Sequence, residues 1–215
     1  MILIKPSYEI LTTINREAIL KKIELCGRVC YKSEDRITED SASKFVEGVR
    51  KNKHFSVLEH EIITVKFVCD RGVSHELVRH RIASFSQEST RYCNYSKDKF
   101  ENQLTFIIPL WLDIKPGKYG FPFLIESVDK KALLWIAVML SIEKSYLQLI
   151  EKNWTPQQAR SVLPNSLKTE IVITANLREW QHIFELRCSE ETHSQMRELM
   201  IPLQKELHEK LPEIF

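Results

Sequence analysis

The residues whose types could bind a ligand or take part in catalysis are densest in one stretch of the chain, residues 75–95. This stretch contains three arginines and two histidines, and Arg79, His80 and Arg81 are consecutive. Guanidinium groups bind phosphate oxygens in a bidentate manner, and neighbouring cations repel one another unless an anion lies between them. The stretch therefore predicts a phosphate-binding pocket lined by arginines, which Arg91 would complete. A solvated basic surface explains the same residue types equally well.

Two other kinds of catalytic site find little support in this stretch. His75-Glu76 begins like the zinc-binding sequence H-E-x-x-H, but arginine occupies the closing position and His80 lies off the helical face of His75. We therefore expect no catalytic metal. Ser89 lacks the G-x-S-x-G turn that presents a nucleophilic serine, so an esterase that uses Ser89 is a weaker alternative.

The low glycine content excludes two common nucleotide-binding architectures. The 215 residues include five glycines, and none of them forms G-x-G-x-x-G or G-x-x-x-x-G-K-[ST]. Side chains would therefore have to bind phosphate in place of a glycine-rich backbone. In addition, 31 Lys and Arg residues stand against 29 Asp and Glu residues, a net charge of +2. This balance argues against a dedicated nucleic-acid-binding protein.

The cysteines and the apolar segments indicate a reduced, cytoplasmic, globular protein. Five cysteines without a C-x-x-C pair fit neither a disulfide framework nor a zinc knuckle. The longest uninterrupted apolar run, residues 132–140, is shorter than the roughly 20 residues that a membrane span requires. The apolar segment at the start of the sequence ends at Pro6, too early for a signal peptide. We expect neither a membrane partner nor a nucleic-acid partner.

Hydrophobic periodicity predicts the helices and strands that would position these residues. Apolar residues at helical spacing indicate helices over residues 15–32, after Thr38, and from after Ser127 to about Lys152. Further helices are expected after Pro156, over Trp180 to Arg187, and from Ser189. Alternating patterns predict strands over residues 61–69 and 168–177. A short strand is also expected over residues 104–108.

The polar residues are expected near the ends of these elements. Ser74 can cap a short helix that runs toward Arg81, and residues 82–100, which show no clear period, suggest a long loop. Asn176 and Arg178 would share the outer face of a strand, either as a ligand wall or simply as a polar surface. Together the elements predict an α+β fold, an antiparallel sheet flanked by several helices.

The sequence from Arg79 onward resembles the signature of flavin-dependent thymidylate synthases. That signature reads R-H-R, seven residues, then serine, and here it is formed by Arg79, His80, Arg81 and Ser89. Other segments of the family occur in the same order along the chain: His54–His60 upstream, and Gln158–Pro164, Asn176–Arg178 and Leu186–Arg187 downstream. The resemblance implies a single flavin-dependent thymidylate synthase domain over residues 1–215.

The resemblance also implies a reaction and its cofactors. The enzyme would be a methyltransferase that converts dUMP to dTMP, with 5,10-methylenetetrahydrofolate as the carbon donor and FAD, reduced by NADPH, as the reductant. No cysteine nucleophile would take part. Members of the family are homotetramers whose active sites are shared between subunits, and the same is expected here. The alternative that the residues leave open is a non-catalytic nucleotide- or RNA-binding module that uses the same arginines.

Finally, the resemblance assigns roles to individual residues. Arg187 would be the catalytic residue, beside the uracil, where a fixed cation favours ionisation at N3. The residues that would bind FAD are Ser56, Glu59, Arg79, His80, Arg81, Gln87, Asn176, Leu177, Arg178 and His182. The residues that would bind dUMP are Glu76, Leu77, Val78, Arg79, Gln87, Glu88, Ser89, Thr90, Arg91, Arg160 and Arg187. His54 and Tyr92 would also contact substrates, near the flavin and the folate.

Overall fold

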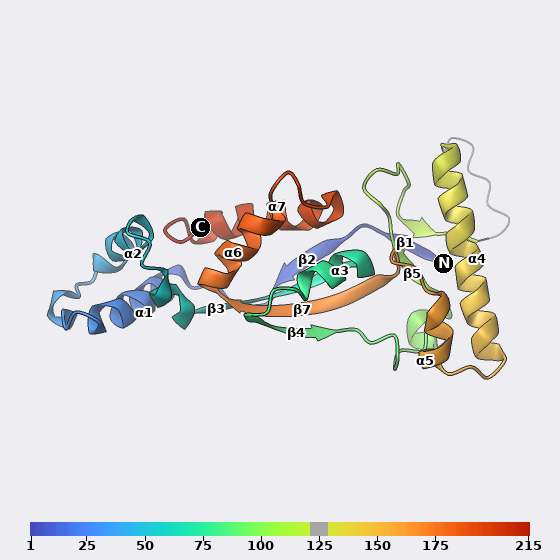
Figure 1. Ribbon diagram of the computed structural model, residues 1–215, viewed down its shortest axis with the longest axis horizontal. Coiled ribbons are helices and arrows are strands. Elements are labelled where there is room, and N and C mark those ends of the chain that lie inside the picture. The colour runs from blue at the N-terminus through green and yellow to red at the C-terminus, as the bar shows by residue number, and fades with distance from the viewer. Residues whose placement is uncertain (121–128) are drawn as a thin grey trace. The chain divides into compact units, whose positions relative to one another are not determined.

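The chain is divided into two compact units, and Figure 1 labels its helices and strands. The computed structural model describes residues 1–120 and 129–215. The first unit comprises Met1–Ser7, Phe67–Arg79 and Ser86–Ile171, and the second comprises Tyr8–Lys66, His80–Phe85 and Val172–Phe215. The predicted helix start after Ser127 lies outside the described residues. That the whole chain is one domain stays a prediction.

Two sheets are formed by the described strands. The strands are β1 (Ile2–Ile4), β2 (Ser7–Ile10), β3 (Ile62–Asp70), β4 (Ala83–Gln87), β5 (Thr105–Ile107), β6 (Gly117–Lys118) and β7 (Lys168–Asn176). The smaller sheet has the order β5-β1-β6 and the larger one the order β2-β3-β7-β4. The predicted α+β fold with antiparallel sheets and several helices is confirmed, with one correction: β1 pairs antiparallel with β6 but parallel with β5. The long connection between β1 and β5 allows this, because parallel strands need a crossover.

The alternating patterns that predicted β3 and β7 are confirmed, and so is the short strand expected at β5. In β7 every second residue is buried, including Ile173 and Ala175. In the second unit, the hydroxyls of Thr64 in β3 and Thr174 in β7 are 2.9 Å apart and hydrogen-bonded. Such cross-strand threonine pairs help to hold the register of a sheet.

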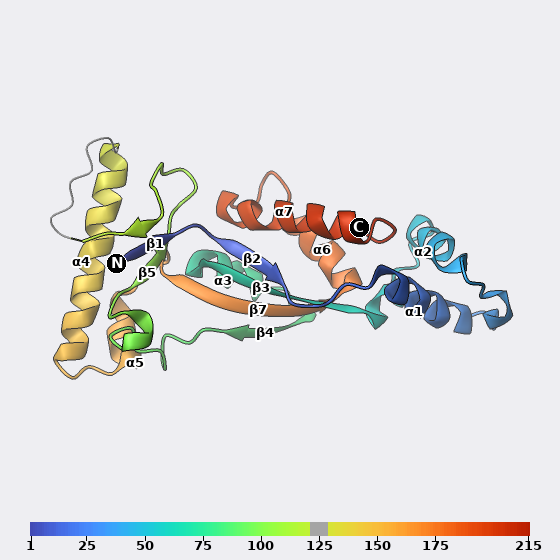
Figure 2. The same cartoon turned by 180° about the vertical axis from the view of Figure 1, so that it is seen from behind.

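Helices α1 (Arg16–Val29) and α2 (Ser41–Lys51) confirm the first two predicted helices. They lie side by side in the second unit, as both views of the ribbon show (Figure 2). Asn15 caps α1, since its side-chain oxygen accepts a hydrogen bond of 3.1 Å from the amide of Ala18. In α2 the predicted apolar stripe is largely buried, with Val46 fully covered.

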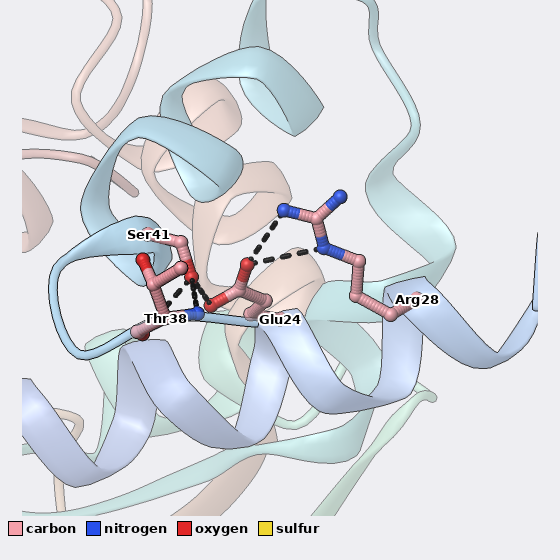
Figure 3. Close-up of polar contacts among 4 residues, drawn as sticks. All are labelled: Glu24, Arg28, Thr38 and Ser41. Carbon is pink, nitrogen blue, oxygen red and sulfur yellow. Dashed lines mark hydrogen bonds and ion pairs between the residues drawn. The ribbon is translucent and has the colours of Figure 1, made fainter. Parts of the chain in front are cut away.

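A buried carboxylate links α1 to the start of α2 (Figure 3). Glu24 is only 1% exposed. One of its oxygens accepts hydrogen bonds from Arg28, at 3.1 and 2.9 Å, and the other accepts one of 2.8 Å from the hydroxyl of Ser41. The amide of Thr38 in turn donates to Ser41 at 2.9 Å. Because a buried charge must be paired and hydrogen-bonded, this cluster fixes the α1–α2 connection and has a structural role.

Helices α6 (Leu177–Arg187) and α7 (Ser194–Lys210) complete the second unit. The buried Trp180 of α6 donates its indole N–H to the carbonyl of Ile63, at 3.0 Å. Helix α7 begins at Ser194, so the predicted start at Ser189 is wrong. The hydroxyls of Ser189 and Thr192 donate to the carbonyl of Leu186, at 3.2 and 2.6 Å, and form a turn instead.

The first unit is organised around α4 (Lys130–Glu151), with α5 (Pro156–Ala159) following it. Thr155 and Gln158 form the capping box that opens α5, as expected for a cap followed by proline. The largest buried side chains of this core include Phe106 and Tyr146. The core therefore joins β5 to α4 within one unit.

Among the described residues, helix α4 is the one that is long and apolar enough to cross a membrane by length and composition alone. Its apolar window has a mean hydropathy of 1.4, and 22% of that window is buried. The sequence-based expectation considered only the uninterrupted run at 132–140 and overlooked the helix as a whole. A single helix of this kind is weak evidence for a membrane span, because core helices share the same composition.

Two predictions about residues 70–100 are wrong. Helix α3 (Arg71–Leu77) is capped by Asp70, whose carboxylate accepts a hydrogen bond of 2.7 Å from the amide of Val73, and Ser74 lies inside the helix. Residues 82–100 are not one long loop, since they contain β4 and a short 3₁₀ helix, Asp98–Phe100. The alternation of β4 was overlooked because its residues are small or polar apart from one phenylalanine.

Candidate active site

The predicted signature begins in the turn between α3 and β4. Because α3 ends at Leu77, the three residues Arg79, His80 and Arg81 lie beyond the helix. Arg79 and Arg81 are exposed, whereas His80 is only 6% exposed. The turn thus exposes the two arginines to solvent and buries the histidine that stands between them in the sequence.

His80 lies between two side chains of α6, both in the second unit. The Nε of Arg187 donates a hydrogen bond of 2.9 Å to Nε2 of His80. On the other side of the ring, Nδ1 lies 3.5 Å from Oε1 of Glu179. The structure therefore brings together the predicted cofactor-binding His80 and the predicted catalytic Arg187, and adds a carboxylate that the sequence analysis had not selected.

The electrostatics keep this imidazole neutral. Burial, together with the smaller effects of the positive charges of Arg187 and His182, lowers the pKa of His80 to about 4. Burial also raises the pKa of Glu179, although the charge of His182 partly opposes this shift. The ring of His182 stands edge-on to that of His80, with centroids 6.1 Å apart. A neutral His80 can accept a hydrogen bond from an arginine, as the geometry requires.

A pocket of about 770 Å³ lies beside these residues in the second unit. Four residues predicted to bind FAD line it: Glu59, Asn176, Arg178 and His182. Asn176 caps α6 by accepting a hydrogen bond of 2.8 Å from the amide of Glu179. This bond fixes the Asn176 side chain at the N-terminus of the helix. Arg178 pairs with Glu59. The expected shared strand face is wrong, because β7 ends at Asn176 and Arg178 lies in α6. Both residues nevertheless line the pocket.

Several residues that line the pocket were missed by the sequence analysis. They are Arg50, Phe55, Ile82, Glu179, Gln181, Phe184, Glu185, Gln204, Ile214 and Phe215. Glu179 and Gln181 could have been found by extending the Asn176–Arg178 segment along the helix that follows it. Phe215 carried no such signal, because its position against the ring of Phe184, with centroids 5.7 Å apart, depends on how the chain end packs.

In the first unit, the second half of the signature starts at the end of β4. The side-chain amide of Gln87 donates to the hydroxyls of Ser74 and Thr169, at 2.9 and 3.2 Å. Its nitrogen is thus used to fix β4 within the protein. A ligand contact of Gln87 would have to come from another atom of the residue.

Glu88 belongs to an ion-pair cluster in the first unit. It accepts hydrogen bonds of 3.0 Å from Tyr95 and of 3.0 Å from Lys168, which also donates 2.6 Å to Glu170. Burial lowers the pKa of Lys168, but the hydrogen bonds and charges of Glu170 and Glu88 outweigh this, so the pKa is raised overall. Burial, with the charge of Glu88, raises the pKa of Tyr95. Both oxygens of the Glu88 carboxylate thus accept hydrogen bonds within the protein, and the contact of Glu88 with dUMP stays a prediction.

Residues 89–93 form a compact turn. The carbonyl of Ser89 accepts hydrogen bonds from the amides of Tyr92 and Cys93, at 3.1 and 2.9 Å. Thr90 is buried and Arg91 is exposed. The Nε of Arg91 donates 2.8 Å to Gln157 of α5, and α5 leads directly to Arg160, which is also exposed. The turn and the residue after α5 thus carry two arginines predicted to bind dUMP, Arg91 and Arg160.

The remaining predicted site residues differ in accessibility. Leu77 and Leu177 are fully buried, so their side chains belong to the core and only their backbone could contact a ligand. The other positions are at least partly accessible: His54, Ser56, Glu76, Val78, Arg81 and Tyr92. Within residues 1–120 and 129–215, no three His, Cys, Asp or Glu side chains lie close enough to hold a metal ion together.

Comparison with known proteins identifies the family. The family model described as "Thymidylate synthase complementing protein" matches residues 13–213. A flavin-dependent thymidylate synthase of Geobacter sulfurreducens is 30% identical over 200 residues, which cover 90% of this chain and 79% of that protein. Another, of Pyrococcus furiosus, is 33% identical over 189 residues, which cover 86% of this chain and 70% of that protein.

A solved structure shares the fold. The crystal structure of the UMP/dUMP methylase PolB from Streptomyces cacaoi, bound with 5-Br dUMP, matches with a TM-score of 0.76 at 18% identity. The match covers 100% of this chain and 95% of that one. Together with the family match over most of the sequence, these findings show that the chain belongs to the thymidylate synthase complementing protein family, the flavin-dependent thymidylate synthases.

Proposed function

We propose that this protein methylates dUMP to dTMP, with 5,10-methylenetetrahydrofolate as the carbon donor and NADPH as the source of electrons. Bound FAD would carry the two electrons that reduce the transferred one-carbon unit to a methyl group. The observation that carries the proposal is the pocket in which four of the residues expected to bind FAD meet, in a chain that belongs to this family.

The residues of the pocket suit FAD. The cofactor has two flat ring systems joined by a pyrophosphate, so it needs both apolar walls and cations. Phe55, Phe184 and Phe215 supply aromatic walls, while Arg50 and Arg178 supply guanidinium groups. Such a combination of apolar surface with a few charged groups is typical of cofactor pockets. No glycine-rich loop is required, in agreement with the low glycine content of the chain.

Arg187 would act on the pyrimidine. Its guanidinium is held through Nε by the neutral His80, so its orientation is fixed before substrate arrives. A cation fixed beside uracil would stabilise the ring anion formed when the N3 proton leaves, and this effect is strongest where water is excluded. The exposed Arg91 and Arg160 would bind the dUMP phosphate. Ser89 would bind substrate and would not act as a nucleophile.

The assembly and the cellular location belong to the same proposal. We infer a cytoplasmic homotetramer that shares its active sites between subunits and binds neither membranes nor nucleic acid. Light scattering of the purified protein would give its mass in solution. A tetramer agrees with the proposal, and a stable, fully active monomer contradicts it.

The function can be tested with purified protein and substrate labelled with tritium at C5 of dUMP. Tritium release should occur, and it should require both NADPH and the folate. Omission of either component serves as the control. A protein that does not bind FAD and releases no tritium would contradict the proposal. If it binds oligonucleotides in a salt-sensitive manner without turnover, the alternative of a nucleotide- or RNA-binding module is correct.

A further inference from the structure

Glu179 carries a feature that the family resemblance did not assign. It stands three residues after the helix cap Asn176, where a glutamate often reaches back to the backbone of the cap residue. Here its side chain is 7% exposed, borders the pocket, and lies with Oε1 3.5 Å from Nδ1 of His80. The carboxylate is thus directed at an imidazole that itself contacts Arg187.

The hydrogen bond from Arg187 determines which nitrogen of His80 carries the proton. An arginine Nε always donates, because the guanidinium does not lose its proton in proteins. Nε2 of His80 must therefore accept, and in a neutral ring the single proton must then reside on Nδ1. Nδ1 is the ring nitrogen that lies 3.5 Å from Oε1 of Glu179, within ion-pair distance. In the opposite tautomer, two N–H groups would point at each other and the bond to Arg187 would be lost.

We propose that Glu179 is a positioning residue, which orients Arg187 by fixing the tautomer and the ring orientation of His80. The role of Arg187 in turnover rests on the function proposed above, whereas the tautomer of His80 does not. A carboxylate that accepts the second N–H of a functional histidine is a recurrent arrangement, and its loss commonly reduces activity although it does not touch the substrate.

The first test reads the tautomer directly and needs no activity. Protein labelled with ¹⁵N-histidine should show a His80 ring with a protonated Nδ1 and an unprotonated Nε2, with the resonances assigned from their absence in His80→Gln. In Glu179→Ala this preference should weaken or reverse. A wild-type ring protonated on Nε2, or a tautomer unchanged in Glu179→Ala, would overturn the proposal.

The second test separates positioning from folding. In Glu179→Ala, kcat for dUMP should fall about tenfold to a hundredfold, the range seen when a histidine-orienting group is lost, with a smaller change in KM. Glu179→Gln should recover most of this loss, since its amide oxygen still accepts from Nδ1–H. Glu190→Ala, which removes an exposed carboxylate just beyond α6, is the matched control. FAD content and thermal unfolding would be measured for every variant.

The outcomes distinguish this proposal from the function on which it rests. Wild-type protein without turnover refutes the proposed function, yet the NMR result still decides the tautomer. Turnover by Glu179→Ala at the wild-type rate refutes the positioning role. So does equal loss in Glu179→Ala and Glu179→Gln, because the acceptor would then be irrelevant. Should Glu179→Ala fail to fold, Glu179→Gln and the wild-type tautomer still provide the decision.

Discussion

The two ends of one sequence signature hold their charged groups in opposite ways. At its beginning, in the second unit, His80 is buried and neutral and contacts Arg187 and Glu179. At its end, in the first unit, Arg91 is exposed, and the adjacent Glu88 is held by Lys168 and Tyr95. A buried, neutral imidazole can orient a neighbouring side chain, whereas an exposed arginine offers its positive charge to a ligand. One run of residues can therefore position a neighbouring side chain at one end and offer charge for an anion at the other.

The largest effect is expected at the buried end, from Arg187→Ala. Turnover of dUMP should fall by at least about a hundredfold, as when a preorganised group that stabilises developing charge is removed. FAD should stay bound, because Arg187 does not line the pocket. Steady-state kinetics and the flavin absorbance would check both statements, with the exposed Arg36→Ala as the control. Loss of the flavin would show that Arg187 has been assigned to the wrong ligand.

Acid should destabilise the buried end through His80. Its pKa is about 4 in the folded protein and about 6.5 in the unfolded chain, so the unfolded state takes up a proton first as the pH falls. Stability is therefore full above about pH 6.5 and falls between about 6.5 and 4, by about 3 kcal/mol when complete.

Urea denaturation of wild type and His80→Gln at neutral and acidic pH isolates this contribution. Groups that titrate in both proteins, such as Glu213, whose pKa is lowered to about 2 chiefly by its hydrogen bond with Arg16, cancel in the comparison. Equal losses of stability in the two proteins would show that His80 is not held neutral.

At the exposed end, Lys168→Met tests whether Glu88 is structural. Removal of the ammonium leaves Glu88 and Glu170 without their shared partner, which should cost about 1–3 kcal/mol in the free energy of unfolding. Lys21→Met is the control, since its pair with Glu17 is exposed and should contribute nothing measurable. If Lys168→Met is as stable as wild type but binds dUMP poorly, Glu88 and Lys168 belong to the substrate site.

The smallest effect is expected for Ser89→Ala. Loss of one hydroxyl contact should weaken dUMP binding by roughly 1 kcal/mol, about fivefold in Kd, and leave residual activity. Isothermal titration and initial rates would measure the two quantities. Complete inactivity at normal dUMP affinity would instead favour a nucleophilic serine.

The sequence predicted the elements with strong periodicity and missed those whose order depends on packing. The apolar stripe of α2 and the alternation of β7 were visible in the sequence, because one face of each element is buried. Strand β4 consists mainly of small and polar residues, and its strand character comes from its place in the larger sheet. The intrinsic strand propensity of single residues does not include such tertiary effects.

The candidate site was predictable in part from the polar residues at the end of β7. Arg178 and Asn176 were expected to form either a ligand wall or a polar surface, and both line the pocket. The contact between Glu179 and His80 joins residues far apart in the sequence, and no local pattern could reveal it. The same holds for the ion pair between Glu88 and Lys168 of β7.

Flavin-dependent methylation of dUMP can be tested by an absorption spectrum of the purified protein. We expect a yellow protein with the spectrum of oxidised FAD, which NADPH bleaches in the presence of dUMP. Addition of 5,10-methylenetetrahydrofolate should then restore the oxidised spectrum as dTMP forms. A colourless protein that cannot be loaded with FAD, or a bound flavin that NADPH and dUMP leave unchanged, would contradict the account.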